Sequence, residues 1–175
     1  MKTLIVIDMQ NDFIDGSLGT HEAQTIVPKA KKKIEEYISR GDWVVFTRDT
    51  HHPNYLQTQE GRNLPVPHCV LLEHGWKISN ELEDYAYNYD NAGVVNKGSF
   101  GYDRWFDWEH EMSDKIELIG LCTDCCVVSN ALILKANFPE TEITVDASCC
   151  AGTTPENHKA ALQVMKSCQI NVVGE

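Results

Sequence analysis

The chain contains no long hydrophobic run, and this absence excludes one broad class of protein. A transmembrane helix needs roughly 18 or more consecutive apolar residues, whereas every apolar stretch here is much shorter. The first residues hold one lysine and a short apolar run that ends at Asp8, so they lack the pattern of a secretory signal peptide. We therefore expect no membrane partner and a cytoplasmic location.

Basic residues are also scarce. The 175 residues include 15 Lys and Arg against 26 Asp and Glu, which gives a net charge of −11. Nucleic-acid binding needs clustered positive charge, and we interpret the one basic cluster, at residues 29–33, as the solvated face of a helix. We expect no nucleic-acid partner.

The cysteines do not fit a disulfide framework. There are seven, an odd number, and four of them form the adjacent pairs Cys125–Cys126 and Cys149–Cys150. Disulfide frameworks of small secreted proteins use an even number of spaced cysteines. We expect reduced thiols, and we interpret Cys149 and Cys150 as packing residues.

Short apolar segments alternate with helical patterns along most of the chain. The expected strands are residues 3–8, 42–47, 93–96, 115–121, 142–146 and 170–173. The expected helices are residues 28–40, 124–136 and 155–167, with a short one near 104–112. This alternation predicts an α/β fold of three layers, in which helices cover both faces of a mostly parallel sheet. We expect one domain over residues 1–175, with a long irregular excursion at about 49–90.

Reactive side chains follow the ends of several expected strands. Asp8, residues 49–51, Lys97 and the segment GLCTDCCV at 120–127 each come just after an apolar run. Sites in parallel sheets lie beyond the carboxyl ends of the strands. We therefore expect these four segments to meet in one crevice.

The three cysteines of this last segment leave more than one chemistry open. Cys122 and Cys125 form a C-x-x-C pair, which would suit a dithiol redox protein. The aromatic, Gly or Pro residues usual around redox pairs are absent, and there is no second C-x-x-C for a zinc ribbon. A catalytically silent binding scaffold is a further alternative.

Cys126 favours nucleophilic catalysis instead. A helix capped by Thr123 or Asp124 would place this cysteine in the first turn, where unpaired N–H groups and the helix dipole favour a thiolate. Lys97 would supply a cation, and Asp8 would accept the thiol proton. Nucleophilic catalysis gives both neighbours a role, whereas dithiol chemistry gives them none.

Taken together, the motifs resemble those of the nicotinamidase and isochorismatase-like family of cysteine hydrolases. They extend over most of the chain: VIDMQNDF (6–13), FTRDTHHP (46–53), PVPHC (65–69), NKGSF (96–100) and GLCTDCCV (120–127). By this resemblance the fold is isochorismatase-like, and Asp8, Lys97 and Cys126 form a catalytic triad. The resemblance further implies a cis peptide bond between Leu121 and Cys122, and an oxyanion hole made by the backbone amides of Cys122 and Cys126.

A metal site is expected in the excursion. Asp49, His51 and His68 offer the mixed oxygen and nitrogen ligands that suit Zn²⁺, Fe²⁺ or Mn²⁺. The resemblance supports this site, because nicotinamidases bind a metal through a D-x-H pair and a later H-C, and it favours Zn²⁺. Glu60 is the candidate fourth ligand.

The activity that the resemblance implies is hydrolysis of nicotinamide to nicotinate and ammonia through a cysteine thioester. We expect Phe13, Leu64 and Phe100 to contact this small-molecule substrate. Pro65 stands where the family usually has an aromatic residue, so an amidase for another small amide, carbamoyl or ureido compound is the alternative. The family also suggests a homo-oligomer.

Overall fold

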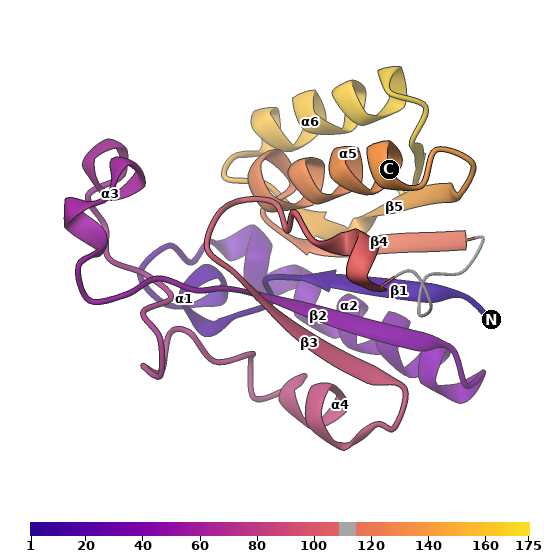
Figure 1. Cartoon of the computed structure of the whole chain (residues 1–175), viewed down its shortest axis with the longest axis horizontal. Coiled ribbons are helices and arrows are strands. Elements are labelled where there is room, and N and C mark those ends of the chain that lie inside the picture. Colours follow the sequence, from indigo (N-terminus) through magenta and orange to yellow (C-terminus); the bar gives the residue numbers. More distant parts are fainter. Residues whose placement is uncertain (109–114) are drawn as a thin grey trace.

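The computed structural model of the chain describes residues 1–108 and 115–175. Within these ranges six strands form one parallel sheet in the order β3-β2-β1-β4-β5-β6 (Figure 1). The strands are β1 Thr3–Ile7, β2 Trp43–Asp49, β3 Ala92–Lys97, β4 Lys115–Leu121, β5 Glu142–Ala151 and β6 Asn171–Val173. The strand order reverses direction between β1 and β4, and in open parallel sheets this switch point is where ligands bind.

Helices lie on both faces of the sheet, which confirms the predicted three-layer α/β fold (Figure 1). The α-helices are α1 Asn11–Ile14, α2 His21–Ser39, α3 Gln59–Asn63, α4 Glu83–Asn88, α5 Val128–Asn137 and α6 Pro155–Ser167. Short 3-10 helices span η1 Tyr55–Gln57 and η2 Trp105–Trp108, and a π-helical turn spans η3 Thr123–Val127. No helix in the described residues is both long and apolar enough to cross a membrane.

Strand β1 shows why the sheet is covered on both sides. Successive side chains of a strand point to opposite faces. Leu4 and Val6 pack in the layer with α2, whereas Ile5 and Ile7 pack in the layer with α5 and α6. All four side chains are fully buried. An unbroken apolar run is therefore the pattern that a central parallel strand requires.

Helix α2 begins earlier than predicted. We expected its start at Pro28, but the helix starts at His21 and contains Pro28 in its interior. Thr20 caps this earlier start, because its hydroxyl accepts a hydrogen bond of 3.0 Å from the Ala23 amide. Apolar residues at helical spacing then anchor the helix to the core: Ala23, Ile26, Val27, Ala30 and Ile34. These contacts outweigh the penalty of a proline whose ring is exposed.

Two further elements differ from the predicted boundaries. Strand β5 continues to Ala151 instead of ending near residue 146, and Cys149 and Cys150 are buried within it. These two side chains pack on opposite faces of the sheet, which agrees with a packing role. Of the short helix expected near 104–112, the structure shows η2, and the rest lies outside the described residues.

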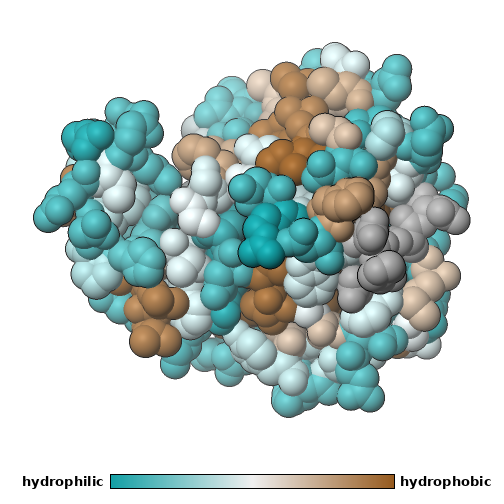
Figure 2. Space-filling view, viewed as in Figure 1, coloured by the Kyte–Doolittle hydropathy of each residue, from teal (hydrophilic) through white to brown (hydrophobic). Residues whose placement is uncertain are grey.

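The excursion between β2 and β3 contains more regular structure than expected. It holds the short helices η1, α3 and α4. The part that carries α3 projects from the body of the molecule, and its surface is mainly hydrophilic (Figures 1 and 2). The excursion returns to the carboxyl edge of the sheet at Val70, which forms a parallel bridge with His51.

Candidate active site

Asp8 lies directly after β1 and is completely buried. Its backbone has a left-handed φ of 45°, so the chain turns away from the sheet at this residue. The Thr47 hydroxyl donates to Asp8 Oδ1 at 2.6 Å and accepts from the Asp8 amide at 3.1 Å. A neighbouring strand thus fixes both the backbone and the carboxylate of Asp8.

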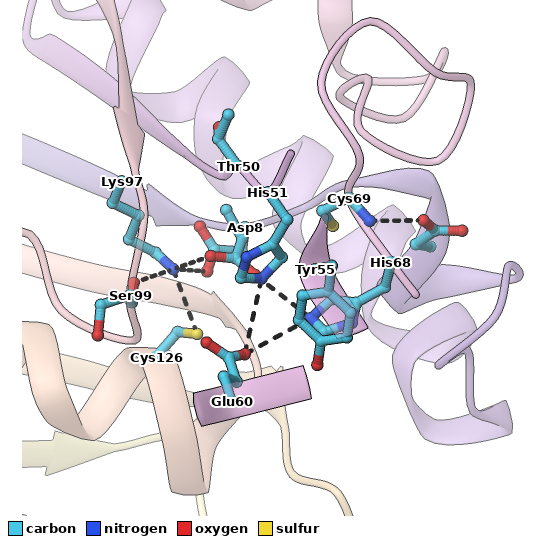
Figure 3. Close-up of polar contacts among 12 residues, drawn as sticks. Asp8, Thr50, His51, Tyr55, Glu60, His68, Cys69, Lys97, Ser99 and Cys126 are labelled. Atoms are coloured by element: carbon cyan, nitrogen blue, oxygen red, sulfur yellow. Dashed lines mark hydrogen bonds and ion pairs between the residues drawn. The ribbon is translucent and has the colours of Figure 1, made fainter. Parts of the chain in front are cut away.

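Lys97, the last residue of β3, brings its ammonium group to Asp8 (Figure 3). Its Nζ atom lies 2.6 Å from Asp8 Oδ2 and 3.4 Å from Cys126 Sγ. Nζ also donates to the Ser99 carbonyl oxygen at 3.0 Å. The side chain is only 3% exposed, and Cys126 is 4% exposed. The three predicted triad residues therefore meet in a buried cluster.

Cys126 lies in the turn η3, at the start of the helical segment that follows β4. The predicted cap by Thr123 or Asp124 is wrong, because Cys122 occupies the cap position and no side chain caps the turn. Asp124 instead accepts a hydrogen bond of 2.7 Å from the Thr153 amide, and the Thr123 hydroxyl pairs with His158 Nδ1 at 2.8 Å. Thr153 of the β5–α6 connection and His158 of α6 therefore hold this turn.

Gly120 allows β4 to approach β1 closely just before this turn. It has a φ of 119°, and a Cβ atom would lie 2.1 Å from the Ile7 carbonyl oxygen. Only glycine fits this position. The peptide bond between Leu121 and Cys122 is cis, as the family resemblance implied.

The ionisation of Cys126 differs from the prediction. Burial, together with the nearby Asp8 carboxylate, raises the pKa of the Cys126 thiol well above its ordinary value, although Lys97 opposes this. A position in the first helical turn therefore does not produce a resting thiolate. The thiol needs a base at the moment of reaction, and Asp8 is the adjacent group that can take the proton.

The charges of Asp8 and Lys97 depend on each other. Burial raises the pKa of the Asp8 carboxyl, and the positive charge of Lys97 limits this rise. Burial alone would lower the pKa of Lys97, but Asp8 and the other neighbouring acidic groups raise it well above its ordinary value. The pair is an ammonium beside a carboxyl group with enhanced proton affinity, which suits a group that must take up and return a proton.

A second cluster adjoins this triad and unites all four predicted metal ligands. One ligand atom from each of Asp49, His51, Glu60 and His68 lies within 4.8 Å of the other three. His51 Nε2 is 2.9 Å from Asp49 Oδ2 and 3.6 Å from Glu60 Oε1. His68 Nε2 is 3.5 Å from Asp49 Oδ2. Two imidazoles and two carboxylates are a donor set that suits Zn²⁺, Fe²⁺ or Mn²⁺, so the residues present fit a divalent metal.

Asp49 belongs to both clusters. Its Oδ1 atom is 3.3 Å from Lys97 Nζ, and its Oδ2 atom lies 2.9 Å from His51 Nε2 and 3.5 Å from His68 Nε2. Burial would raise the pKa of this carboxyl, but hydrogen bonds with His51 and His68 and the charge of Lys97 hold it below its usual range. The group is therefore an anion, as a metal ligand has to be.

A cavity of about 330 Å³ opens onto both clusters. Its lining includes Asp49, His68 and Cys126 and also the three predicted substrate-contacting residues, Phe13, Leu64 and Phe100. Phe13 lies against the His68 ring, with 5.5 Å between ring centroids. Leu64 is 39% exposed and Phe100 is 47% exposed, so they stand at the open side of the cavity.

Cys122 and Cys125 line the same cavity, but their environment does not favour redox chemistry. Burial raises the pKa of Cys122 to about 12 and that of Cys125 to about 11. A reactive dithiol needs at least one thiol with a lowered pKa. Cys126 is more deeply buried than Cys122 and Cys125, and it alone of the three is hydrogen-bonded to Lys97 within the described residues.

Sequence reasoning missed Tyr55, which supports the metal-ligand group. Its ring lies 4.7 Å from the His51 ring and 5.0 Å from the His68 ring, centroid to centroid. Its hydroxyl donates to the Leu64 carbonyl oxygen at 2.9 Å. The available signal was an aromatic residue four positions after His51, in a segment that we had interpreted as irregular.

Comparison with known proteins agrees with this geometry. The chain matches the family model described as Isochorismatase domain over residues 2–174. It is 25% identical to the nicotinamidase of Saccharomyces cerevisiae over 218 aligned residues, which cover 99% of each chain.

Two solved structures have the same fold over nearly their full length. The pyrazinamidase of Pyrococcus horikoshii in complex with zinc superposes with a TM-score of 0.84 and 27% identity, covering 99% of each chain. The N-carbamoylsarcosine amidase of Thermoplasma acidophilum superposes with a TM-score of 0.80 and 27% identity, covering 98% of this chain and 95% of that one.

Proposed function

Because the chain belongs to the isochorismatase family, we propose that it is a metal-containing nicotinamidase, which hydrolyses nicotinamide to nicotinate and ammonia. The observation that carries the proposal is the contact between two clusters. The Asp8–Lys97–Cys126 group adjoins a four-residue group of oxygen and nitrogen ligands, and both open onto one cavity. A triad alone supports a cysteine hydrolase, and the adjacent ligand group supports a pyridine carboxamide as substrate.

The reaction proceeds in two stages. Asp8 takes the proton of the Cys126 thiol, and the sulfur attacks the carboxamide carbon of the substrate. The resulting oxyanion accepts hydrogen bonds from the backbone amides of Cys122 and Cys126. Asp8 then returns the proton to the leaving nitrogen, the C–N bond breaks, and ammonia leaves a thioester on Cys126.

The second stage releases the acid. Asp8 takes a proton from a water molecule, whose oxygen attacks the thioester carbon. As the C–S bond breaks, Asp8 returns this proton to the sulfur of Cys126, and the carboxylic acid departs. Lys97 remains charged throughout, because its pKa is raised by the acidic groups around it. Its positive charge stabilises the carboxylate of Asp8 and the sulfur anion during each transfer.

Asp49, His51, Glu60 and His68 would hold the divalent metal, for which we propose Zn²⁺. A bound metal would supply Lewis-acid chemistry beside the cavity, for which the pyridine nitrogen of the substrate is a suitable donor. In this arrangement Phe13 would pack against one face of the substrate ring. Leu64 and Phe100 would cover the substrate at the open side of the cavity. The similarity to a zinc-bound pyrazinamidase supports this assignment.

A second candidate is an amidase for a small carbamoyl or ureido compound. The similarity to N-carbamoylsarcosine amidase supports it, as does Pro65 in place of the aromatic residue expected in a nicotinamidase. Both candidate activities use the same nucleophile, and they differ in the part of the substrate that is attached to the reacting carbonyl carbon.

Ammonia release separates the two candidates. The purified chain is assayed with nicotinamide and with carbamoyl and ureido compounds, as the chelator-treated protein and again after Zn²⁺, Fe²⁺ or Mn²⁺ is restored. We expect activity on nicotinamide that falls on chelation and returns with metal. A metal-loaded protein that releases ammonia only from the carbamoyl compounds would exclude the nicotinamidase.

We propose a cytoplasmic enzyme that folds as one domain, supported by seven free cysteines and by one family match over residues 2–174. A homo-oligomer is the assembly that the family suggests.

A further inference from the structure

Gln10 has no role in the mechanism above, although it lies within the DMQND motif. It follows β1 by three residues and is completely buried. Within residues 1–108 and 115–175, its side chain makes hydrogen bonds only to backbone groups. Nε2 donates to the carbonyl oxygens of Asp49 at 2.9 Å and Trp76 at 2.8 Å, and Oε1 accepts from the Asp49 amide at 2.7 Å.

The position of Asp49 in the sheet explains why these bonds are needed. The pairing of β1 with β2 ends at Val6 and Phe46, because the chain turns away at Asp8. Strand β2 continues for three more residues and is paired there with β3 alone. The amide and the carbonyl of Asp49 both bond to Gln10, which lies where the next residues of β1 would otherwise run. The Gln10 side chain replaces the missing strand.

This replacement matters because Asp49 connects the two clusters of the active site. Its two carboxylate oxygens face different partners, with Oδ1 at 3.3 Å from Lys97 and Oδ2 at 2.9 Å from His51. A small rotation of the Asp49 backbone would move one oxygen away from its partner. We propose that Gln10 is a positioning residue that fixes the Asp49 backbone, and thereby sets the geometry of the metal-ligand group beside the triad.

A purely structural role for Gln10 predicts something different. A buried amide with all its groups hydrogen-bonded stabilises any fold, and its loss would then lower stability without a selective effect on the metal. The positioning role predicts weaker metal binding in a protein that is still folded. The inference rests on the proposed metal site, but it does not depend on which amide is hydrolysed.

The test measures Zn²⁺ affinity of the full chain after chelator treatment, by competition with a coloured chelator and without any substrate. Gln10→Met keeps the size of the side chain and removes all three hydrogen bonds. Gln10→Asn keeps both polar groups on a side chain one carbon shorter, so that it cannot reach Asp49 and Trp76 together. Tyr89→Phe is the matched control, because Tyr89 donates a hydrogen bond of 2.8 Å to the Asp42 carbonyl oxygen, next to the opposite end of β2.

We expect both Gln10 variants to bind Zn²⁺ about 10- to 100-fold more weakly, as is usual when support of a metal ligand is lost. The absorption bands of the Co²⁺-loaded protein should shift in both variants. Tyr89→Phe should lower the thermal midpoint yet keep the Zn²⁺ affinity within about twofold of wild type.

Zn²⁺ affinities within about twofold of wild type in folded Gln10 variants would overturn the inference. If Gln10→Met does not fold, the Zn²⁺ affinities of Gln10→Asn and Tyr89→Phe are compared to test the inference. If the wild type binds no Zn²⁺, the metal site and this inference fail together. If it binds Zn²⁺ but does not hydrolyse nicotinamide, the proposed substrate fails and the inference on Gln10 is still decided by the affinities.

Discussion

Cys125 and Cys126 are adjacent in the chain but have different neighbours. Cys126 is hydrogen-bonded to Lys97, which in turn contacts Asp8. Cys125 lines the cavity without such a contact among the described residues. Both thiols have raised pKa values, so reactivity depends on whether a base and a cation lie beside the sulfur.

Substitution of the two cysteines therefore separates hydrolysis from dithiol chemistry. We expect Cys126→Ala to lower amide hydrolysis by at least about 1000-fold, because the nucleophile is removed. Cys125→Ser should retain activity within about threefold, since the side chain only lines the cavity. Ammonia release from the metal-loaded proteins measures both, with circular dichroism as the control for folding. The opposite ranking of the two variants would favour the dithiol alternative.

Helix α2 contains a proline, Pro28, in its interior. Pro28 has no N–H to donate to the carbonyl of Gln24, one turn earlier. Pro28→Ala should restore this bond and raise the free energy of unfolding by about 1 to 2 kcal/mol, after the entropy that proline removes from the unfolded chain is subtracted.

Pro155 is the matched control for this substitution. It occupies the first turn of α6, directly after the capping residue Thr154, where a backbone N–H has no hydrogen-bond partner within the helix. Pro155→Ala should therefore leave stability unchanged or lower it by up to about 1 kcal/mol. Urea unfolding of both variants gives the comparison, and a Pro28→Ala protein no more stable than wild type would contradict the expectation.

The same helix is tied to the sheet by a cluster of charges. Lys33 Nζ lies 2.8 Å from Glu117 Oε1 on β4 and 2.9 Å from Asp146 Oδ2 on β5. Burial raises the pKa of Asp146, but hydrogen bonds from Lys33 and Ser148 outweigh it and leave the pKa lowered. A lowered carboxyl pKa contributes stability above the unfolded value of about 3.9, and this contribution is lost as the pH falls through the folded value.

Lys33→Met should therefore destabilise the protein in a pH-dependent way. At pH 7 we expect a loss of about 1 to 2 kcal/mol, because two partly buried carboxylates lose their shared cation. As the pH falls below about 4 and through the lowered folded pKa of Asp146, the loss should shrink, since this carboxyl is then protonated in both proteins. Urea unfolding at several pH values measures this loss of stability. Lys32→Met is the control, because Lys32 is exposed. A loss of equal size at every pH would contradict this account.

At the scale of the whole molecule, the metal-ligand group joins the sheet to the excursion. Asp49 belongs to β2, Glu60 to the projecting helix α3, and His68 to the returning segment (Figure 1). A bound metal would therefore cross-link the sheet, the projecting helix and the returning segment.

Metal removal should lower the stability of the whole chain. With Zn²⁺ at about 100 times its dissociation constant, binding stabilises the folded state by about 2.7 kcal/mol. Thermal unfolding of the chelator-treated protein should then have a midpoint about 5 to 10 °C lower. Hydrogen exchange should increase mainly in residues 51–68. An unchanged midpoint would show that the ligand group does not bind the metal in the folded protein.

The order of strands and helices and the positions of the chemical groups along the chain follow from the pattern of amino acids alone. An unbroken apolar run such as β1 indicates burial on both faces of the sheet, because successive side chains of a strand point to opposite faces. Asp8, Lys97 and Cys126 were predicted to converge because parallel strands end at one edge of the sheet. Those inferences need only local periodicity and the topology that it implies.

The remaining features depend on contacts between distant parts of the chain. The raised pKa of Cys126, the contact of Tyr55 with His68 and the bonds of Gln10 to Asp49 all involve residues far apart in the sequence. Burial sets the cost of a charge, and burial arises from the packing of every layer together. A local pattern of residues therefore places a nucleophile, but only the folded chain fixes which group carries the proton.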